Sequence, residues 1–174
     1  MFTRENIEDE LNRLLNDRRN NYVLYDVKKP IVDFLLYLQN IKNENKKVSY
    51  NVLIIDDNFA RSGELCEHIS MMMEKMFGNG CGLAGADIKE WYAAKRFWAE
   101  DHHFFENVRR FYPAITGIVF RNVTKQVCQG EMWDKLVAEF REDDTTNLVK
   151  ILCTNRDTAN YLEENYEDVY FRYF

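Results

Sequence analysis

Apolar side chains recur at helical spacing in the first quarter of the chain, before any stretch that is typical of a strand. Two such groups predict two amphipathic helices, the second of which follows Pro30. Their apolar positions are Ile7, Leu11, Leu14 and Leu15 in the first, and Ile31, Phe34, Leu35, Leu38 and Ile41 in the second. A polar run at 42–47 follows, and then an apolar block at 52–55 ends at Asp56 and Asp57. A short apolar block between polar residues indicates a strand that is buried on both faces, as in a parallel sheet.

The rest of the chain alternates between helical and strand-like patterns. A helical face begins after Gly63, and its apolar positions are Leu65, Ile69, Met72, Met73 and Met76. The glycine-rich stretch 78–85 predicts a connection and a short strand. Further along we expect a helix at 97–111, a strand at 115–120, a helix at 132–140, a strand at 148–153, a helix at 157–165 and a strand at 169–174. This alternation predicts one α/β domain over 1–174, with a helical lead-in at 1–47, a sheet core at 48–174 and helices on both faces of a parallel sheet.

Composition narrows the class of protein further. The 174 residues are 46% hydrophobic, and 29 Asp and Glu against 23 Lys and Arg give a formal net charge of −6. This sign disfavours a nucleic-acid partner, because phosphate backbones attract basic proteins. No apolar run approaches the roughly 20 residues that span a bilayer, and the amino terminus has no signal-peptide core. We therefore expect no membrane partner and a cytoplasmic location.

The four cysteines give no sign of a metal site or a disulfide framework. Cys66, Cys81, Cys128 and Cys153 are widely spaced, form no CxxC pair and lie among apolar or small residues. They are expected to be buried, reduced thiols, and no metal ligand set is predicted.

Ligands of open parallel sheets bind at the carboxyl ends of the strands, and here the sequence resembles a known family. Asp56-Asp57-Asn58-Phe59-Ala60-Arg61-Ser62-Gly63 follows the strand at 52–55, where AAA+ ATPases carry their phosphate loop. The stretch ADIKEWY at 86–92 is similar to that family's ADLVGEY, and 133–155 resembles its helix, acidic break and sensor strand. Residues 26–174 resemble the CbxX/CfxQ branch of the AAA+ ATPases, the rubisco-activase and sporulation-protein-K-like group. The resemblance implies a three-layer, P-loop-NTPase-like domain with a five-stranded parallel sheet in the order 5-1-4-3-2.

The phosphate loop of that family is degenerate in this chain. The signature G-x-x-x-x-G-K-[ST] lets backbone amides, a lysine and a hydroxyl hold phosphates and magnesium. The resemblance places Asp56 at the first glycine, Arg61 at the second, Ser62 at the lysine and Gly63 at the hydroxyl. The carboxylates of Asp56 and Asp57 would also repel phosphate groups.

The other nucleotide motifs implied by the resemblance are also altered. Where the family has an acidic pair for magnesium, the strand at 115–120 runs into Arg121 and Asn122. Thr154 and Asn155 resemble the family's polar sensor, and Arg172 lies near the position of its arginine finger. The sequence given ends where the family's helical lid would begin, which leads us to expect a unit without a lid.

These substitutions predict a non-catalytic, pseudo-ATPase-like module that acts by binding protein, either a second copy of itself or an active AAA+ relative. It would have no catalytic residue and no cofactor. Its vestigial nucleotide site would comprise Asp56, Asp57, Arg61, Ser62, Gly63, Asn122, Thr154 and Asn155. An alternative from a different class is an unusual enzyme site that binds ATP with magnesium, or another metal, through Asp56, Asp57, Asn122 and Thr154.

Two further alternatives start from the same strand ends. A response-regulator receiver needs acids after its first strand and a Thr after its fourth, which Asp56, Asp57 and Thr154 match. It also needs an acceptor Asp where Arg121 or Asn122 stands, and a later Lys that is missing, so only a degenerate receiver fits. The block VLIIDD followed by SG suggests a phosphoribosyltransferase, but the spacing is off by one residue.

Other polar and soft side chains favour structural roles. His102, His103 and Glu106 could form half of a metal site, but a solvated helix face explains them with fewer assumptions. The methionines at 71–73 and 76 are expected in the core rather than on an adaptable binding surface, and the acids at 142–144 are expected at a helix end. We also expect Asp56 and Asp57 to cap the helix that follows them.

Overall fold

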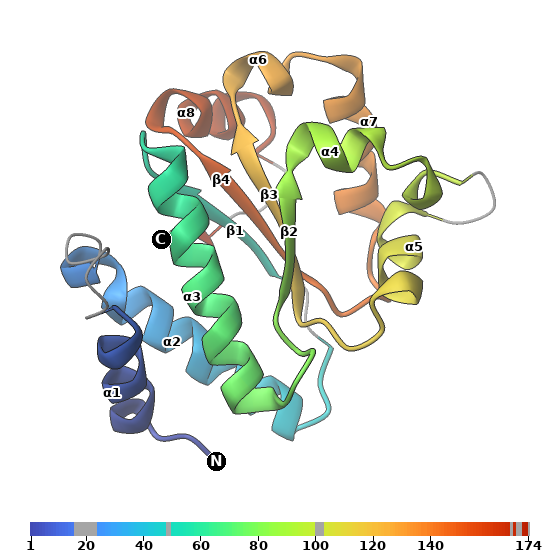
Figure 1. The fold of residues 1–174 in the computed structure, drawn as a ribbon. Coiled ribbons are helices and arrows are strands. Elements are labelled where there is room, and N and C mark those ends of the chain that lie inside the picture. The colour runs from blue at the N-terminus through green and yellow to red at the C-terminus, as the bar shows by residue number, and fades with distance from the viewer. Residues whose placement is uncertain (16–23, 48–49, 100–102, 168, 170–171, 174) are drawn as a thin grey trace.

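The computed structural model describes residues 1–15, 24–47, 50–99, 103–167, 169 and 172–173 (Figure 1). Its helices are α1 (Arg4–Leu15), α2 (Leu24–Asn43), α3 (Phe59–Phe77), α4 (Ile88–Ala93), the 3-10 helix η1 (Lys95–Phe97), α5 (Phe104–Phe111), α6 (Lys125–Cys128), α7 (Glu131–Glu142) and α8 (Arg156–Asn165). Its strands are β1 (Tyr50–Ile55), β2 (Leu83–Asp87), β3 (Gly117–Val123), β4 (Val149–Thr154) and the two-residue β5 (Arg172–Tyr173). Strands and helices alternate after β1, as the hydrophobic pattern predicts.

The strands pair in parallel. β1 pairs with β4 from Tyr50 opposite Val149 to Ile55 opposite Thr154, β4 pairs with β3, and β3 pairs with β2. The four strands thus lie in the order β2-β3-β4-β1, and β5 pairs with Val52 and Leu53 of β1. The predicted α/β class with a parallel sheet is confirmed. The pairing of β1 with β4 differs from the 2-1-3-4-5 order of receiver-type sheets, so the structure does not support the receiver hypothesis.

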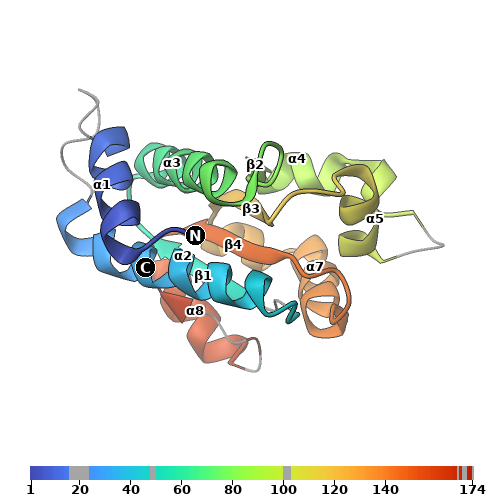
Figure 2. The same cartoon turned by 90° about the horizontal axis from the view of Figure 1, so that it is seen from below.

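Helices cover both faces of the sheet, as Figure 2 shows with α3 on one side of the strands and α8 on the other. Val52 and Ile54 of β1 pack into a core with α1, α2 and α3. Leu53, between them in the sequence, packs into a second core with α4, α5, α7 and α8. This alternation follows from the two-residue period of a strand. The lead-in helices α1 and α2 therefore belong to the same core as the sheet.

The expected helix at 97–111 is wrong as a single element. The described part consists of η1 and, after a gap at 100–102, α5, while the short helices α4 and α6 were not predicted. The apolar spacing there reflects an aromatic cluster instead, in which Trp91 contacts Phe97, Phe104 and Phe120. Trp91 also donates from Nε1 to the carbonyl of Val119 at 2.8 Å, which ties α4 to β3.

The methionine and cysteine predictions hold in most positions. Met72 and Met73 are fully buried and Met76 packs against the same core, but Met71 is 47% exposed, so its predicted core position is wrong. Among the cysteines, which are all free thiols, three are buried, and only Cys81 is half-buried. The buried three are Cys66, Cys128 and Cys153.

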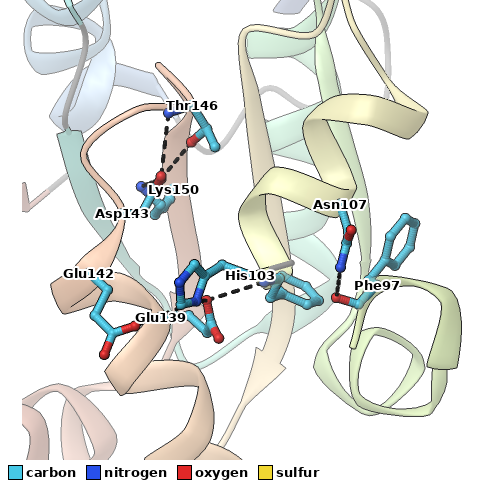
Figure 3. A network of polar contacts seen from close by, with 9 residues as sticks. Phe97, His103, Asn107, Glu139, Glu142, Asp143, Thr146 and Lys150 are labelled. Atoms are coloured by element: carbon cyan, nitrogen blue, oxygen red, sulfur yellow. Dashed lines mark hydrogen bonds and ion pairs between the residues drawn. The ribbon is translucent and has the colours of Figure 1, made fainter. Parts of the chain in front are cut away.

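The acidic stretch 142–144 marks a helix end, as predicted, and it contains a buried ion pair. α7 ends at Glu142, and Asp143 lies 2.6 Å from Nζ of Lys150 on β4, with both side chains almost fully buried (Figure 3). Thr146 donates to the same carboxylate from its backbone N–H at 3.3 Å and from its hydroxyl at 2.5 Å. Burial favours the neutral acid, but the charge of Lys150 and these hydrogen bonds hold the pKa of Asp143 below its ordinary value.

Candidate functional site

The connection that follows β1 is short, and two of its three polar side chains hydrogen-bond locally. Asp56, Asp57 and Asn58 form the whole link between Ile55, the last residue of β1, and Phe59, the first of α3. Asn58 is the N-cap, because its Oδ1 accepts the backbone N–H of Arg61 at 3.1 Å. The expectation that Asp56 and Asp57 cap this helix is therefore wrong. The N-cap signal was in the sequence, since Asn directly before a helical pattern is a preferred cap.

Asp56 instead binds Arg61 at two points. Arg61 donates from Nε to Oδ2 at 2.5 Å and from Nη2 to Oδ1 at 2.6 Å, and the N–H of Asn58 also donates to Oδ1, at 2.9 Å. The Arg61 side chain, by hydrogen bonding and charge, is the main reason that the pKa of Asp56 lies below its ordinary value. The negative charge of Asp56 is thus balanced within the chain.

Two backbone N–H groups in the stretch that resembles a phosphate loop are already engaged within the chain. A phosphate cradle needs free backbone N–H groups, but the N–H of Ser62 donates to the carbonyl of Asn58 and the N–H of Arg61 to its side chain. Ser62, at the lysine position, is 1% exposed and donates its hydroxyl to the carbonyl of Phe59. Gly63, at the hydroxyl position, is buried inside the helix.

The remaining predicted residues point to separate partners. Oδ1 of Asp57 accepts the N–H of Arg156, the first residue of α8, at 3.4 Å. Asn155 caps α8 by accepting the N–H of Thr158 at 2.9 Å. Thr154 is fully buried and donates its hydroxyl to the carbonyl of Val123 at 2.7 Å. The side chains of Asp56, Asp57, Asn122 and Thr154 are thus engaged with different partners, although the backbone N–H of Asp56 donates to the carbonyl of Thr154 at 2.9 Å.

The carboxyl end of β3 is irregular, and this was not predicted. The register between β3 and β4 shifts between Phe120 and Val123, and Asn122 has a positive φ of 57°. Asn tolerates this left-handed conformation better than most residues. Its Nδ2 donates to Oδ2 of Asp87, the N-cap of α4, at 2.6 Å. Asp87 lies within the ADIKEWY stretch, but only the fold shows that it meets Asn122.

Arg121, within the same irregularity, lines a cavity of about 350 Å³ between α3, β2 and β3. Its Cδ runs beside Gly63, where an added Cβ would lie at an ordinary contact distance of 3.6 Å. From the sequence, Arg121 was identified only as a residue that stands where AAA+ proteins have an acid. The signal that would have identified it is a charged residue on the strand face that Val119 also occupies, because such a position is enclosed by α3.

A second cavity of about 510 Å³ lies at the opposite end, where Lys42 and Lys46 meet the loops before β3 and β4. Arg109 lines it, but its guanidinium donates to the backbone carbonyls of residues 113, 115, 146 and 147 at 2.7–3.3 Å. This arginine therefore holds two loops together and has little capacity left for a ligand.

The alternative half of a metal site, with His102 and Glu106 one helical turn apart, lies partly outside the described residues. His102 lies outside the described residues, and Nδ1 of His103 is 3.4 Å from Glu139 and 3.5 Å from Glu142 on α7 (Figure 3). The charge of Glu139 is the main cause of a raised pKa at His103. Within the described ranges no group of three or more His, Cys, Asp or Glu could hold a metal ion, and no helix there is long and apolar enough to cross a membrane.

Comparison with known proteins adds no family to this picture. No protein-family model matches the chain, and no curated protein matches it significantly.

Proposed function

We propose that this chain is a non-catalytic, AAA+-like domain that acts through contacts with other proteins rather than by nucleotide hydrolysis. In this proposal the sheet is that of P-loop NTPases, with five strands in the order 5-1-4-3-2. The pairing of β2 with β3, β3 with β4, β4 with β1 and the short β5 with β1 supports that order. The AAA+ resemblance adds the expected partners, which are a second copy of this chain or an active AAA+ protein.

The observation that carries the proposal is the closed turn after β1. α3 begins at Phe59, so the residues that would wrap a phosphate are already helical, and Arg61 is paired with Asp56. At the end of β3, where an acid would orient magnesium, Arg121 and Asn122 stand instead. A scaffold that keeps the sheet and loses these groups is suited to binding proteins, since contact surfaces do not need them.

Two exposed apolar side chains give the proposal a place to be tested. Met71 on α3 is 47% exposed and Phe111 on α5 is 55% exposed, and they belong to different helix layers. The Cζ atom of Arg96 lies over the Phe111 ring, 4.6 Å from its centroid, in a cation–π contact. Large exposed apolar groups are enriched at protein contacts.

The experiment is sedimentation velocity of the purified chain from low micromolar to near-millimolar concentration, alone and mixed with an active AAA+ protein of the same cell. We expect one of the two variants, Met71→Asp or Phe111→Asp, to weaken association. The other variant, at the exposed side chain that is not in the contact, should associate as the wild type does and is the matched control. If the chain sediments as a monomer throughout, and binds no AAA+ protein in the mixture, the proposed function is wrong.

A further inference from the structure

Four described side chains, those of Tyr92, Arg121, Trp133 and Thr158, have a buried polar atom without a hydrogen-bond partner, and of these Arg121 carries a charge. Its Nε is shielded from solvent and has no hydrogen-bond partner. Its guanidinium makes no hydrogen bond or ion pair with any residue that the structure describes. A buried hydrogen-bond donor without a partner costs free energy, so an unpaired donor of this kind needs an explanation, such as a ligand that accepts its hydrogen bond. The irregularity at Asn122 directly follows this residue, and such irregularities often occur next to binding sites.

The cavity beside Arg121 has room for that partner. It measures about 350 Å³, within the range of small-molecule sites. Gly63 on α3 and Gly85 on β2 leave it open, because neither carries a side chain into it. A Cβ at Gly85 would meet Val119 at an ordinary 3.5 Å, so close packing of the strands does not demand the glycine.

Part of the cavity wall offers apolar surface to the body of a ligand. Cys66, Leu83 and Val119 contribute apolar surface, and Met71 lies at the margin. The hydroxyl of Ser70 is already engaged, because it accepts the N–H of Leu83 at 2.8 Å. Arg121 is thus the cationic group of this cavity, and a guanidinium binds a planar carboxylate through two parallel hydrogen bonds.

The surrounding charge restricts the ligand to a single negative charge. Glu67 also lines the cavity, and the chain as a whole carries a formal charge of −6. Both would oppose a phosphate or a dicarboxylate more strongly than a monocarboxylate. A short, branched monocarboxylic acid fits the one cation and the apolar walls together.

We propose that this cavity binds a small, branched aliphatic monocarboxylate, whose carboxylate pairs with Arg121 and whose apolar body lies against Cys66, Leu83 and Val119. This site is separate from the turn after β1. Met71 at its margin is also one of the proposed protein-contact residues, but the proposed ligand contacts are those of Arg121, Cys66, Leu83 and Val119. The cavity lies between residues 63–71 of α3, Leu83 and Gly85 of β2, and Val119 and Arg121 of β3.

The test compares 3-methylbutanoate with 3-methylbutanamide, which has nearly the same shape and no charge. The readout is the Nε–H resonance of Arg121 in a ¹H–¹⁵N NMR titration, together with the melting temperature. The acid should shift this resonance and raise the melting temperature, and the amide should do neither. Equal responses to the two compounds would show that the cavity is merely apolar, and no response to the acid would overturn the proposal.

Variants separate binding from folding. Arg121→Gln should weaken binding of the acid roughly tenfold or more, because it removes a charged hydrogen-bond pair. Arg121→Met should also abolish binding but melt at the same or a higher temperature, since it removes an unpaired donor. Arg110→Gln, at an exposed position on α5, is the matched control and should bind normally. Equal binding by Arg121→Gln and Arg110→Gln would contradict the assignment.

Glu67 provides an internal check. Glu67→Gln removes the nearest repulsive charge and should tighten binding of the acid a few-fold, with little change in the Arg121 resonance before ligand is added. If the unliganded Arg121 resonance moves strongly in this variant, Glu67 itself is the partner of Arg121. The cavity then needs no carboxylate from outside, and the proposal is overturned.

Discussion

Arg61 forms two hydrogen bonds with the carboxylate of Asp56: Nε donates to Oδ2 at 2.5 Å and Nη2 donates to Oδ1 at 2.6 Å. This pair spans the turn between the end of β1 and the first turn of α3. It places a cation and an anion of the same chain where a phosphate-binding loop would hold its ligand. Asn58 caps α3, and its backbone N–H donates to Asp56. The charge of Asp56 is therefore balanced by groups of the turn and of the first turn of α3.

Replacing Asp56 by Asn should lower the free energy of unfolding by about 1 kcal/mol, as expected for a partly exposed two-point pair. The folded-state pKa of Asp56 is lowered, so its stabilisation is present above the unfolded-state pKa of about 3.9 and is lost as the pH falls through the folded-state pKa. Urea unfolding across the acid range measures both effects. Asp57→Asn is the control, since Asp57 accepts one long hydrogen bond of 3.4 Å, and equal losses in the two variants would contradict the pairing.

Gly63→Ala should stabilise the protein by about 0.5–1 kcal/mol, because Ala is the better helix former and its Cβ finds only ordinary contact with Arg121. Gly117→Ala should have the opposite effect, since its Cβ would lie 2.5 Å from the carbonyl oxygen of Val149. Thermal and urea unfolding of the two variants give the comparison. Loss of stability in Gly63→Ala would show that α3 does not run through this position as described.

Asp143→Asn should cost about 3 kcal/mol of unfolding free energy, because it leaves the buried Lys150 ammonium without its counter-charge. The double variant Asp143→Leu with Lys150→Met should recover most of this loss, since two apolar side chains leave no charge unpaired. Urea unfolding of Asp143→Leu, Lys150→Met and the double variant, analysed as a double-mutant cycle, measures the coupling. If the double variant is as unstable as the sum of the singles, the pair is not coupled as the structure indicates.

His103 should stabilise the fold only while it is protonated. Its folded-state pKa is raised, mainly by Glu139, so its contribution is complete below the unfolded-state pKa of about 6.5 and is lost as the pH rises through the folded-state pKa. The stability difference between wild type and His103→Gln should therefore be larger at about pH 5 than at about pH 8. The Glu139→Gln background should reduce that difference, and a difference that grows with pH would contradict the contacts of His103 with α7.

The hydrophobic pattern predicted much of the fold because each main strand is buried on two faces and each long helix on one. The block at 52–55 is apolar throughout because Val52 and Leu53 serve opposite cores, and the helical spacing of Ile69 and Met72 marks the buried face of α3. The short helices α4 and α6 escaped prediction because one turn or two cannot display a period. The aromatic cluster around Trp91 imitated helical spacing through tertiary contacts.

The candidate site was predictable only in part. The resemblance to AAA+ proteins drew attention to its residues, but the partner of each side chain depends on the fold. Asp57 reaches the start of α8, 99 positions away, and Asn122 reaches Asp87, 35 positions away. By that resemblance, Arg121 stands where AAA+ proteins have an acid. The sequence could not show that its Nε has no hydrogen-bond partner, because this depends on how α3 and β2 enclose the side chain.

The most direct test is a thermal-unfolding scan of the intact chain with and without millimolar ATP or ADP and magnesium. A ligand at 100 times its dissociation constant adds about 2.7 kcal/mol of stability, which for a domain of this size raises the melting temperature by about 5–10 °C. The closed turn formed by Asp56, Asn58 and Arg61 predicts no shift with either nucleotide. A magnesium-dependent rise of this size would show that a working nucleotide site exists and would contradict a non-catalytic, AAA+-like domain.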